Sequence, residues 1–252
     1  MKRPQSSSVR LRIQRFDPKI DSAPHYDTFE IPTKKGMTVL DALFYVLERK
    51  DGSLAFRYSC RSAICGSCAT YINRRPRLAC KTQIATLGSA ITIGPLPHLP
   101  VIRDLVVDLH PFYRKNDSLM PHFEARTPIP EMEFIQSPKE RATIDTAIDC
   151  IDCGACFSSC PLTWTDSKYP GPAAFMKAYR FIADTRDAKG IERLQAVGCE
   201  DGVWRCHTVF NCADSCPKGL NPTYFIQQLK RKATKLSIGQ LSLTQIAQPH
   251  GR

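Results

Sequence analysis

The feature that most constrains this chain is a run of four closely spaced cysteines, Cys150-Ile-Asp-Cys153-Gly-Ala-Cys156-Phe-Ser-Ser-Cys160-Pro161. The spacing C-x2-C-x2-C-x3-C-P is that of bacterial ferredoxins, in which three cysteines bind one four-iron cluster and the fourth binds a different cluster. A structural zinc site is the alternative, but zinc-binding cysteines usually come as two separated pairs. The run therefore predicts iron–sulfur clusters and a further group of ligands elsewhere in the chain.

That further group lies at Cys206-x5-Cys212-x3-Cys216-Pro217. It repeats the spacing of the first run, except that the position of its second cysteine is occupied by Val209. If the two groups exchange their last cysteines, one site has four thiolates and the other has three. The two sets are Cys150, Cys153, Cys156 and Cys216, and Cys160, Cys206 and Cys212. An iron without a thiolate is easily lost, so we predict a [4Fe–4S] and a [3Fe–4S] cluster; a water or other ligand that completes a second four-iron cluster is the alternative.

A third group of cysteines comes earlier in the chain, at Cys60-x4-Cys65-x2-Cys68 and then Cys80. The order C-x4-C-x2-C…C is that of a plant-type [2Fe–2S] cluster. Gly66 and its small neighbours would let backbone amides approach the sulfurs, and such hydrogen bonds tune the reduction potential. Four buried core cysteines are the alternative, which the regular spacing disfavours.

These groups take eleven of the twelve cysteines in the 252 residues. Cys199 is the remaining one, and we expect it to be a small buried hydrophobic residue.

Disulfides would suit a small secreted protein, but the chain begins without the apolar segment of a signal peptide. Residues 1–8 are basic and Ser-rich like a transit peptide, yet a strand pattern starts at Val9. We therefore expect no removable targeting segment, a bacterial or archaeal origin, and a peripheral position on the cytoplasmic face of the cell membrane.

The formal net charge of +11 indicates a basic solvated surface. No nucleic-acid-binding motif accompanies this charge, so we expect no nucleic-acid partner. The run Lys230-Arg231-Lys232 would suit an anionic membrane surface. The longest apolar stretches are too short to span a bilayer.

Hydrophobic periodicity predicts a mixed first domain and a helical second one. Apolar residues alternate at 9–15 and 27–31, a capped helix begins at Thr38, and short strands follow near 69–73 and 90–93, which together make an α+β roll. Residues 101–113 carry a helical stripe, which we expect to kink or break at Pro111. In the second domain we expect a helix within 170–187 and a last helix opened by Asn221-Pro222.

The cysteine groups, with the stretch from Cys206 to Pro222, Gly171-Pro-Ala and residues 178–187, resemble the iron–sulfur subunit of succinate dehydrogenase and fumarate reductase. The resemblance extends from about residue 9 to about residue 235. It implies a plant-type ferredoxin (β-grasp) domain over 1–115 and an all-α bacterial-ferredoxin-like domain over 116–252.

The resemblance further implies a relay within the tricarboxylic acid cycle and the respiratory chain. An FAD-containing flavoprotein partner would oxidise succinate, and electrons would pass singly through [2Fe–2S], [4Fe–4S] and [3Fe–4S] to a quinone at the membrane. Membrane-anchor subunits are implied as well, with their haem b content left open. The chain would be a conduit, so we expect no catalytic acid–base residues in it. A quinol:fumarate reductase, the same machine run backwards, and a free-standing ferredoxin-like carrier or metal-stabilised binding module are the alternatives.

By the same resemblance, Pro161, Trp164, His207 and Val209 match positions that line the family's quinone pocket. His207 is the natural proton donor near neutral pH, although a histidine there could merely orient Cys206 or cap a helix. Two departures bear on the chemistry. Thr165 stands where many ubiquinone-reducing members have a second tryptophan, which leaves the quinone type open, and Arg61-Ser62-Ala63 replaces the usual Arg-Glu-Gly, which removes an acid near the first cluster.

Overall fold

The computed structural model describes residues 8–239, and its contacts form two compact units. The first unit comprises the chain up to Leu109 together with Ile151–Ser159, and the second comprises His110–Cys150 and the chain from Cys160 onward. The expectation about a targeting segment in residues 1–8 concerns residues that, apart from Ser8, lie outside the described part. The domain division near residue 115 stays a prediction.

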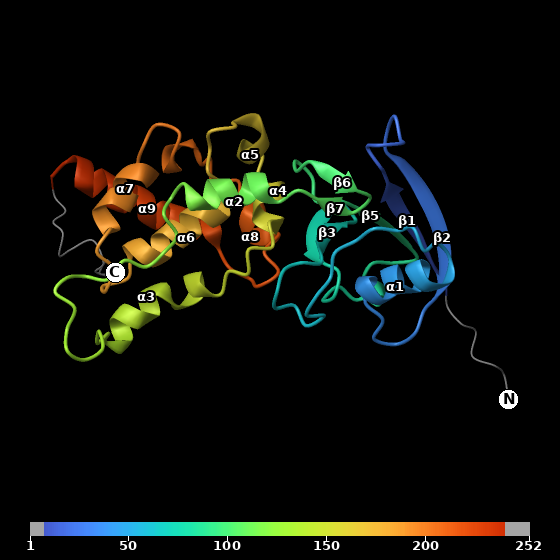
Figure 1. Cartoon of the computed structure of the whole chain (residues 1–252), viewed down its shortest axis with the longest axis horizontal. Coiled ribbons are helices and arrows are strands. Elements are labelled where there is room, and N and C mark those ends of the chain that lie inside the picture. Colours follow the sequence, from blue (N-terminus) through green and yellow to red (C-terminus); the bar gives the residue numbers. More distant parts are fainter. Residues whose placement is uncertain (1–7, 240–252) are drawn as a thin grey trace. The chain divides into compact units, whose positions relative to one another are not determined.

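The first unit is built on a five-stranded sheet with the strand order β2-β1-β5-β3-β4. Strands β1, β2, β3 and β5 of this sheet are labelled in Figure 1. Strand β1 pairs antiparallel with β2 and parallel with β5, while β3 pairs antiparallel with both β5 and β4. The strands are β1 (Ser8–Arg15), β2 (His25–Pro32), β3 (Ala69–Ile72), β4 (Arg75–Leu78) and β5 (Ala90–Gly94), with a 3-10 turn η1 (Ile84–Thr86) before β5. This arrangement confirms the α+β roll.

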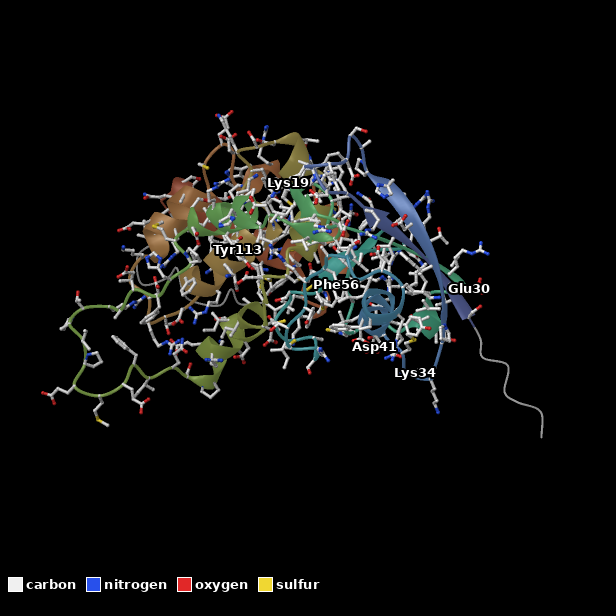
Figure 2. All side chains as sticks on the ribbon, turned by 45° about the vertical axis from the view of Figure 1, so that its right-hand side comes forward. Lys19, Glu30, Lys34, Asp41, Phe56 and Tyr113 are labelled. Atoms are coloured by element: carbon white, nitrogen blue, oxygen red, sulfur yellow. The ribbon has the colours of Figure 1, made fainter. Side chains whose placement is uncertain are left out.

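Local sequence explains the elements of this roll. Val9, Leu11 and Ile13 of β1 are all buried, as the alternation predicted. Helix α1 (Val39–Arg49) starts at a capping box in which Thr38 Oγ1 accepts from the backbone of Asp41, and the Asp41 carboxylate accepts from the backbone of Thr38 (Asp41 is labelled in Figure 2). The buried face of α1 and the sheet share one hydrophobic core.

The helix predicted over residues 101–113 is wrong. The segment forms two short strands, β6 (Val101–Arg103) and β7 (Val106–Val107), followed by helix α2 (His110–Asp117). The turn between the strands is fixed by Asp104, which is 2% exposed and accepts hydrogen bonds from the backbone of Phe16 and from Arg15. Pro111 does not break a helix, because it lies in the first turn of α2, where a backbone N–H has no helical partner to lose.

The second unit is helical and is organised around α6 (Pro172–Ile182), which contacts α2, α3, α7 and α9. Nineteen buried residues form its core, among them Phe175, Tyr179 and Leu229. Its other helices are α3 (Pro138–Ile148), α5 (Leu162–Thr165), α7 (Gly190–Val197), α8 (Asn211–Asp214) and α9 (Pro222–Ser237), with a 3-10 turn η2 (Val203–Arg205). The short helix α4 (Ala155–Ser159) belongs to the first unit.

Two predicted features of the second unit are confirmed. The helix expected within 170–187 is α6, and Asn221 caps α9 by accepting a hydrogen bond from the backbone of Tyr224 at 3.0 Å, with Pro222 as the first helical residue. No helix within residues 8–239 combines the length and the hydropathy that crossing a membrane requires.

The basic run of α9 does not form one exposed cationic face. Lys232 is 2% exposed, and burial lowers the pKa of its amino group to about 8. Lys230 is half-buried and donates to the carbonyl of Cys206 at 2.9 Å, which leaves Arg231 as the exposed member of the three. Successive helical residues point in different directions, so three adjacent cations cannot share one face. The three basic residues therefore do not form the exposed cationic surface that binding to an anionic membrane would use.

Candidate metal centres

The first cysteine group lies in the loop between α1 and β3 and just after β4. The loop turns its backbone amides onto the sulfurs, because Arg61, Ala63 and Gly66 all adopt positive φ. Three amides donate to the sulfur of Cys60, and a fourth donates to that of Cys80. These contacts are Ser62, Cys65 and Ile64 to Cys60 at 3.3, 3.3 and 3.4 Å, and Ala63 to Cys80 at 3.3 Å.

The hydrogen bonds that these cysteine sulfurs accept favour thiolates over thiols. A hydrogen bond from the Ser67 hydroxyl is the largest of the effects that lower the pKa of Cys65 to about 6. Cys68 is 6% exposed, and burial raises the pKa of its thiol to about 12. A buried thiolate needs a positive partner, which iron supplies, so this donor set fits a cluster that bridges exposed and buried cysteines.

Gly66 of this loop lies against residues 151–153, which belong to the same unit and carry a cysteine of the next group. It has φ of +77°, and a Cβ added there would lie 2.8 Å from the carbonyl oxygen of Ile151 and 2.9 Å from the Cβ of Cys153. Both the backbone angle and the close approach require glycine. The loop of Cys65 and the loop of Cys153 are thus in direct backbone contact.

The third candidate centre lies within the second unit, where Cys160, Cys206 and Cys212 line one pocket. Val209 lines the same pocket, as do Pro161 and His207. The pocket has about 330 Å³ of empty space, part of it open to solvent. The structure therefore brings together the three cysteines predicted for the three-iron cluster and the valine that replaces a fourth.

Helix α9 fixes the loop that carries Cys206. Besides the bond from Lys230 to the Cys206 carbonyl, the Gln227 amide donates to the hydroxyl of Thr208 at 3.0 Å. The sulfur of Cys212 lies 3.2 Å from the hydroxyl of Thr223. Burial raises the thiol pKa of both Cys160 and Cys212, so these cysteines too need a cationic group to be held as thiolates.

The residues predicted for a quinone pocket are only partly brought together. Pro161, His207 and Val209 share the pocket of the three cysteines, and His207 is exposed. Trp164 is 53% exposed and is not among the residues that line this pocket. Sequence reasoning also missed Tyr169 and Thr223, which do line it, because nothing in their spacing separates them from core residues.

The four cysteines predicted for the [4Fe–4S] cluster are divided between the units. Cys153 and Cys156 belong to the first unit, while Cys150 and Cys216 belong to the second. This ligand set stays a prediction. Among residues 8–239, no three His, Cys, Asp or Glu side chains are grouped closely enough to hold one metal ion. Iron–sulfur clusters distribute their thiolates over two or more irons, so their ligands enclose a larger group than a single zinc ion does.

The expectation that Cys199 is buried is wrong, because its side chain is exposed. The residue follows α7 in a turn where its carbonyl accepts from the amide of Gly202 at 2.9 Å. The neighbouring carbonyl of Gly198 accepts from the indole of Trp204 at 2.8 Å. The turn is thus held by backbone groups and leaves the thiol in solvent.

Replacing Cys199 with serine should therefore be nearly silent. A substitution of an exposed side chain that leaves the backbone hydrogen bonds of the turn in place changes the free energy of unfolding by about 0.5 kcal/mol or less. We expect thermal unfolding and the iron and sulfide content of the purified protein to be unchanged. Loss of a cluster signal would show that Cys199 is a ligand and that the assignment above is incorrect.

Comparisons with known proteins agree with this arrangement. Residues 10–114 match the model of the 2Fe-2S iron-sulfur cluster binding domain, and residues 146–220 match that of the 4Fe-4S dicluster domain. Together with the fold and the three cysteine groups, these matches define an iron–sulfur electron-transfer protein made of two ferredoxin-type parts.

Relatives identify the particular family. The chain is 41% identical over 223 residues to the succinate dehydrogenase iron-sulfur subunit of Paracoccus denitrificans, an alignment that covers 88% of this chain and 86% of that protein. It is 43% identical over 231 residues to the succinate dehydrogenase (ubiquinone) iron-sulfur subunit 1, mitochondrial, of Oryza sativa subsp. japonica, covering 90% and 82%. The chain belongs to the succinate dehydrogenase iron–sulfur subunit family.

A solved structure supports the same conclusion. The fold matches a chain of the Mycobacterium smegmatis Sdh1 complex in the apo form with a TM-score of 0.85 and 25% identity, over 92% of this chain and 98% of that one. The resemblance stated from the sequence and the predicted fold class are thereby confirmed.

Proposed function

We propose that this chain is the iron–sulfur subunit of a membrane-bound succinate dehydrogenase, the respiratory complex II, and passes electrons from the FAD of a flavoprotein subunit to a quinone. The observation that carries the proposal is the pocket in which Cys160, Cys206 and Cys212 meet Val209 and His207. Three thiolates with a valine in place of the fourth suit a three-iron carrier, and an adjacent exposed histidine suits an acceptor that must take up protons.

The ligand sets we propose are those that the cysteine spacing predicts. The [2Fe–2S] cluster is assigned to Cys60, Cys65, Cys68 and Cys80, the [4Fe–4S] cluster to Cys150, Cys153, Cys156 and Cys216, and the [3Fe–4S] cluster to Cys160, Cys206 and Cys212. Clusters of these kinds accept and release one electron at a time, which divides the two-electron oxidation of a reduced flavin into single-electron steps.

The residues of this chain hold and tune those centres. The amides of residues 62–65 donate to the sulfurs of Cys60 and Cys80 and so stabilise negative charge there. The hydroxyl of Thr223 lies beside the sulfur of Cys212, and Cys212 is only 7% exposed. Shielding limits solvent access, which helps to set the reduction potential of a cluster held there.

The proposed contact with a quinone rests on the exposed residues that line the pocket. His207, Val209 and Phe210 are exposed there, and two of them are apolar, with Val209 54% and Phe210 49% exposed. Exposed apolar residues beside a redox centre suit contact with membrane-anchor subunits and a hydrophobic quinone. We propose Pro161, His207 and Val209 as quinone contacts, with exposed Trp164 as an outer contact. We place the subunit peripherally, on the cytoplasmic face of a bacterial or archaeal membrane; quinone type and haem b are not assigned.

The proposal is tested by purifying the chain with its native partners. The complex should contain a flavoprotein and membrane subunits, should reduce a quinone with succinate, and should show the electron paramagnetic resonance (EPR) signals of [2Fe–2S], [4Fe–4S] and [3Fe–4S] centres. The purified single chain should carry clusters and show no succinate oxidation with dye acceptors. Succinate oxidation by the single chain, or a chain isolated without partners from native membranes, would contradict the relay.

Replacing His207 with alanine should slow quinone reduction by roughly a hundredfold and change dye reduction little. A positioned proton donor contributes about that factor, and a dye can draw electrons earlier in the relay. The measurement compares succinate:quinone with succinate:dye rates in the same membranes. Equal losses with both acceptors would mean that His207 supports Cys206 and not the quinone.

A further inference from the structure

Tyr169 is a fully buried tyrosine whose hydroxyl makes no hydrogen bond of good geometry within the described part of the chain, although the side chain of Cys206 is close enough to interact with it. The side chain is 0% exposed, and its ring packs on Phe175 with the centroids 5.4 Å apart. Leaving a buried hydroxyl unsatisfied loses its hydration without a compensating hydrogen bond and is destabilising. Native proteins seldom tolerate such a group, which points to an acceptor that the protein atoms alone do not provide.

The surroundings of Tyr169 show where that acceptor lies. Tyr169 lines the same pocket as Cys160, Cys206 and Cys212. A tyrosine hydroxyl keeps its proton at neutral pH, because its ordinary pKa is about 10, so it remains a donor. It is the only tyrosine among the residues that line the pocket.

Two hydrogen bonds hold the backbone of Tyr169 in place. The amino group of Lys115 in α2 donates to the carbonyl of Tyr169 at 2.7 Å, and the amide of Tyr169 donates to the carbonyl of Asp166 at 3.3 Å. A hydroxyl on a buried ring with a fixed backbone has little freedom to seek another partner. The geometry is that of a preorganised donor aimed into the pocket of the three cysteines.

We propose that the Tyr169 hydroxyl donates a hydrogen bond to a sulfur of the cluster held by Cys160, Cys206 and Cys212, and thereby raises the reduction potential of that cluster. Reduction adds negative charge to the cluster, and a hydrogen bond to sulfur stabilises the reduced form more than the oxidised form. Tyr169 would thus tune the last carrier of the relay without being a ligand. The inference rests on the proposed assignment of a three-iron cluster to this pocket.

The test replaces Tyr169 with phenylalanine, which removes only the oxygen, in the complete complex. A redox titration followed by EPR should show the signal of the oxidised [3Fe–4S] centre at full intensity but with a midpoint potential below that of the wild type. Tyr179→Phe is the matched control: Tyr179 is 7% exposed in the same core and does not line the pocket. It should leave the potential unchanged.

The outcomes separate the inference from the proposed function. Absence of any [3Fe–4S] signal in the wild type would overturn the cluster assignment itself. A wild-type signal with equal potentials in wild type and Tyr169→Phe, or equal shifts in the two variants, would overturn the role of Tyr169 alone. If Tyr169→Phe does not assemble the cluster, the inference is tested on the wild-type complex, prepared with ring-¹³C-labelled tyrosine. Pulsed EPR should then detect a ¹³C nucleus coupled to the centre, and its absence would overturn the inference.

Discussion

Replacing Val209 with cysteine is expected to convert the cluster proposed at Cys160, Cys206 and Cys212 from three irons to four. Cys206, Val209 and Cys212 repeat the spacing of Cys150, Cys153 and Cys156, and Val209 lines the pocket of the other three cysteines. The side chain is 54% exposed, so the smaller cysteine leaves no core cavity. Thr208 and Phe210 on either side adopt positive φ, which makes a turn that presents residue 209 at the pocket.

A fourth iron changes the type and charge of the cluster, and both help to set its reduction potential. We expect the potential to fall, which makes the last carrier a poorer acceptor for electrons from succinate and slows quinone reduction. EPR of the air-oxidised protein should lose the [3Fe–4S] signal while the iron content rises by one per chain. Val209→Ala, which adds no thiolate, should keep both the signal and the iron content. A wild type that already carries four irons at this site would refute the argument.

Elements whose causes are local could be predicted from the sequence. The alternation in β1, the capping box at Thr38 and the Asn221-Pro222 start of α9 each depend on neighbours within a few residues. The segment 101–109 could not be predicted in this way. Its hairpin depends on Asp104 accepting from Arg15, 89 residues earlier in the chain, and such a distant partner leaves no periodic trace in the sequence.

The same distinction applies to the site. The cysteine spacing was sufficient to group Cys160 and Cys206 into one pocket with Val209, because cluster geometry requires such spacing. It was not sufficient to show that Cys199 is exposed, since burial depends on where α7 ends. Nor could it single out Tyr169, whose significance is an unsatisfied hydroxyl that only a three-dimensional arrangement shows.

Gly66→Ala is expected to damage the first two clusters together. Gly66 adopts φ of +77°, which costs an L-residue about 1–2 kcal/mol. The new methyl would also lie 2.8 Å from the carbonyl oxygen of Ile151 and 2.9 Å from the Cβ of Cys153, so backbone must move, and such overpacking typically costs about 1–3 kcal/mol more. Because Cys65 flanks Gly66 and Cys153 lies against it, ligands proposed for two different clusters would shift at once.

The measurements are thermal unfolding and the EPR intensities of the reduced [2Fe–2S] and [4Fe–4S] centres. Gly88→Ala is the matched control, because Gly88 has φ of +85° but nothing within 4 Å of an added Cβ. The control should lose stability through backbone strain alone and keep both signals. Equal loss of signal in the two variants would mean that strain in the first unit is sufficient to release the clusters. A loss confined to Gly66→Ala would instead show that the contact between the Cys65 and Cys153 loops keeps both sets of ligands in place, and this is the outcome we expect.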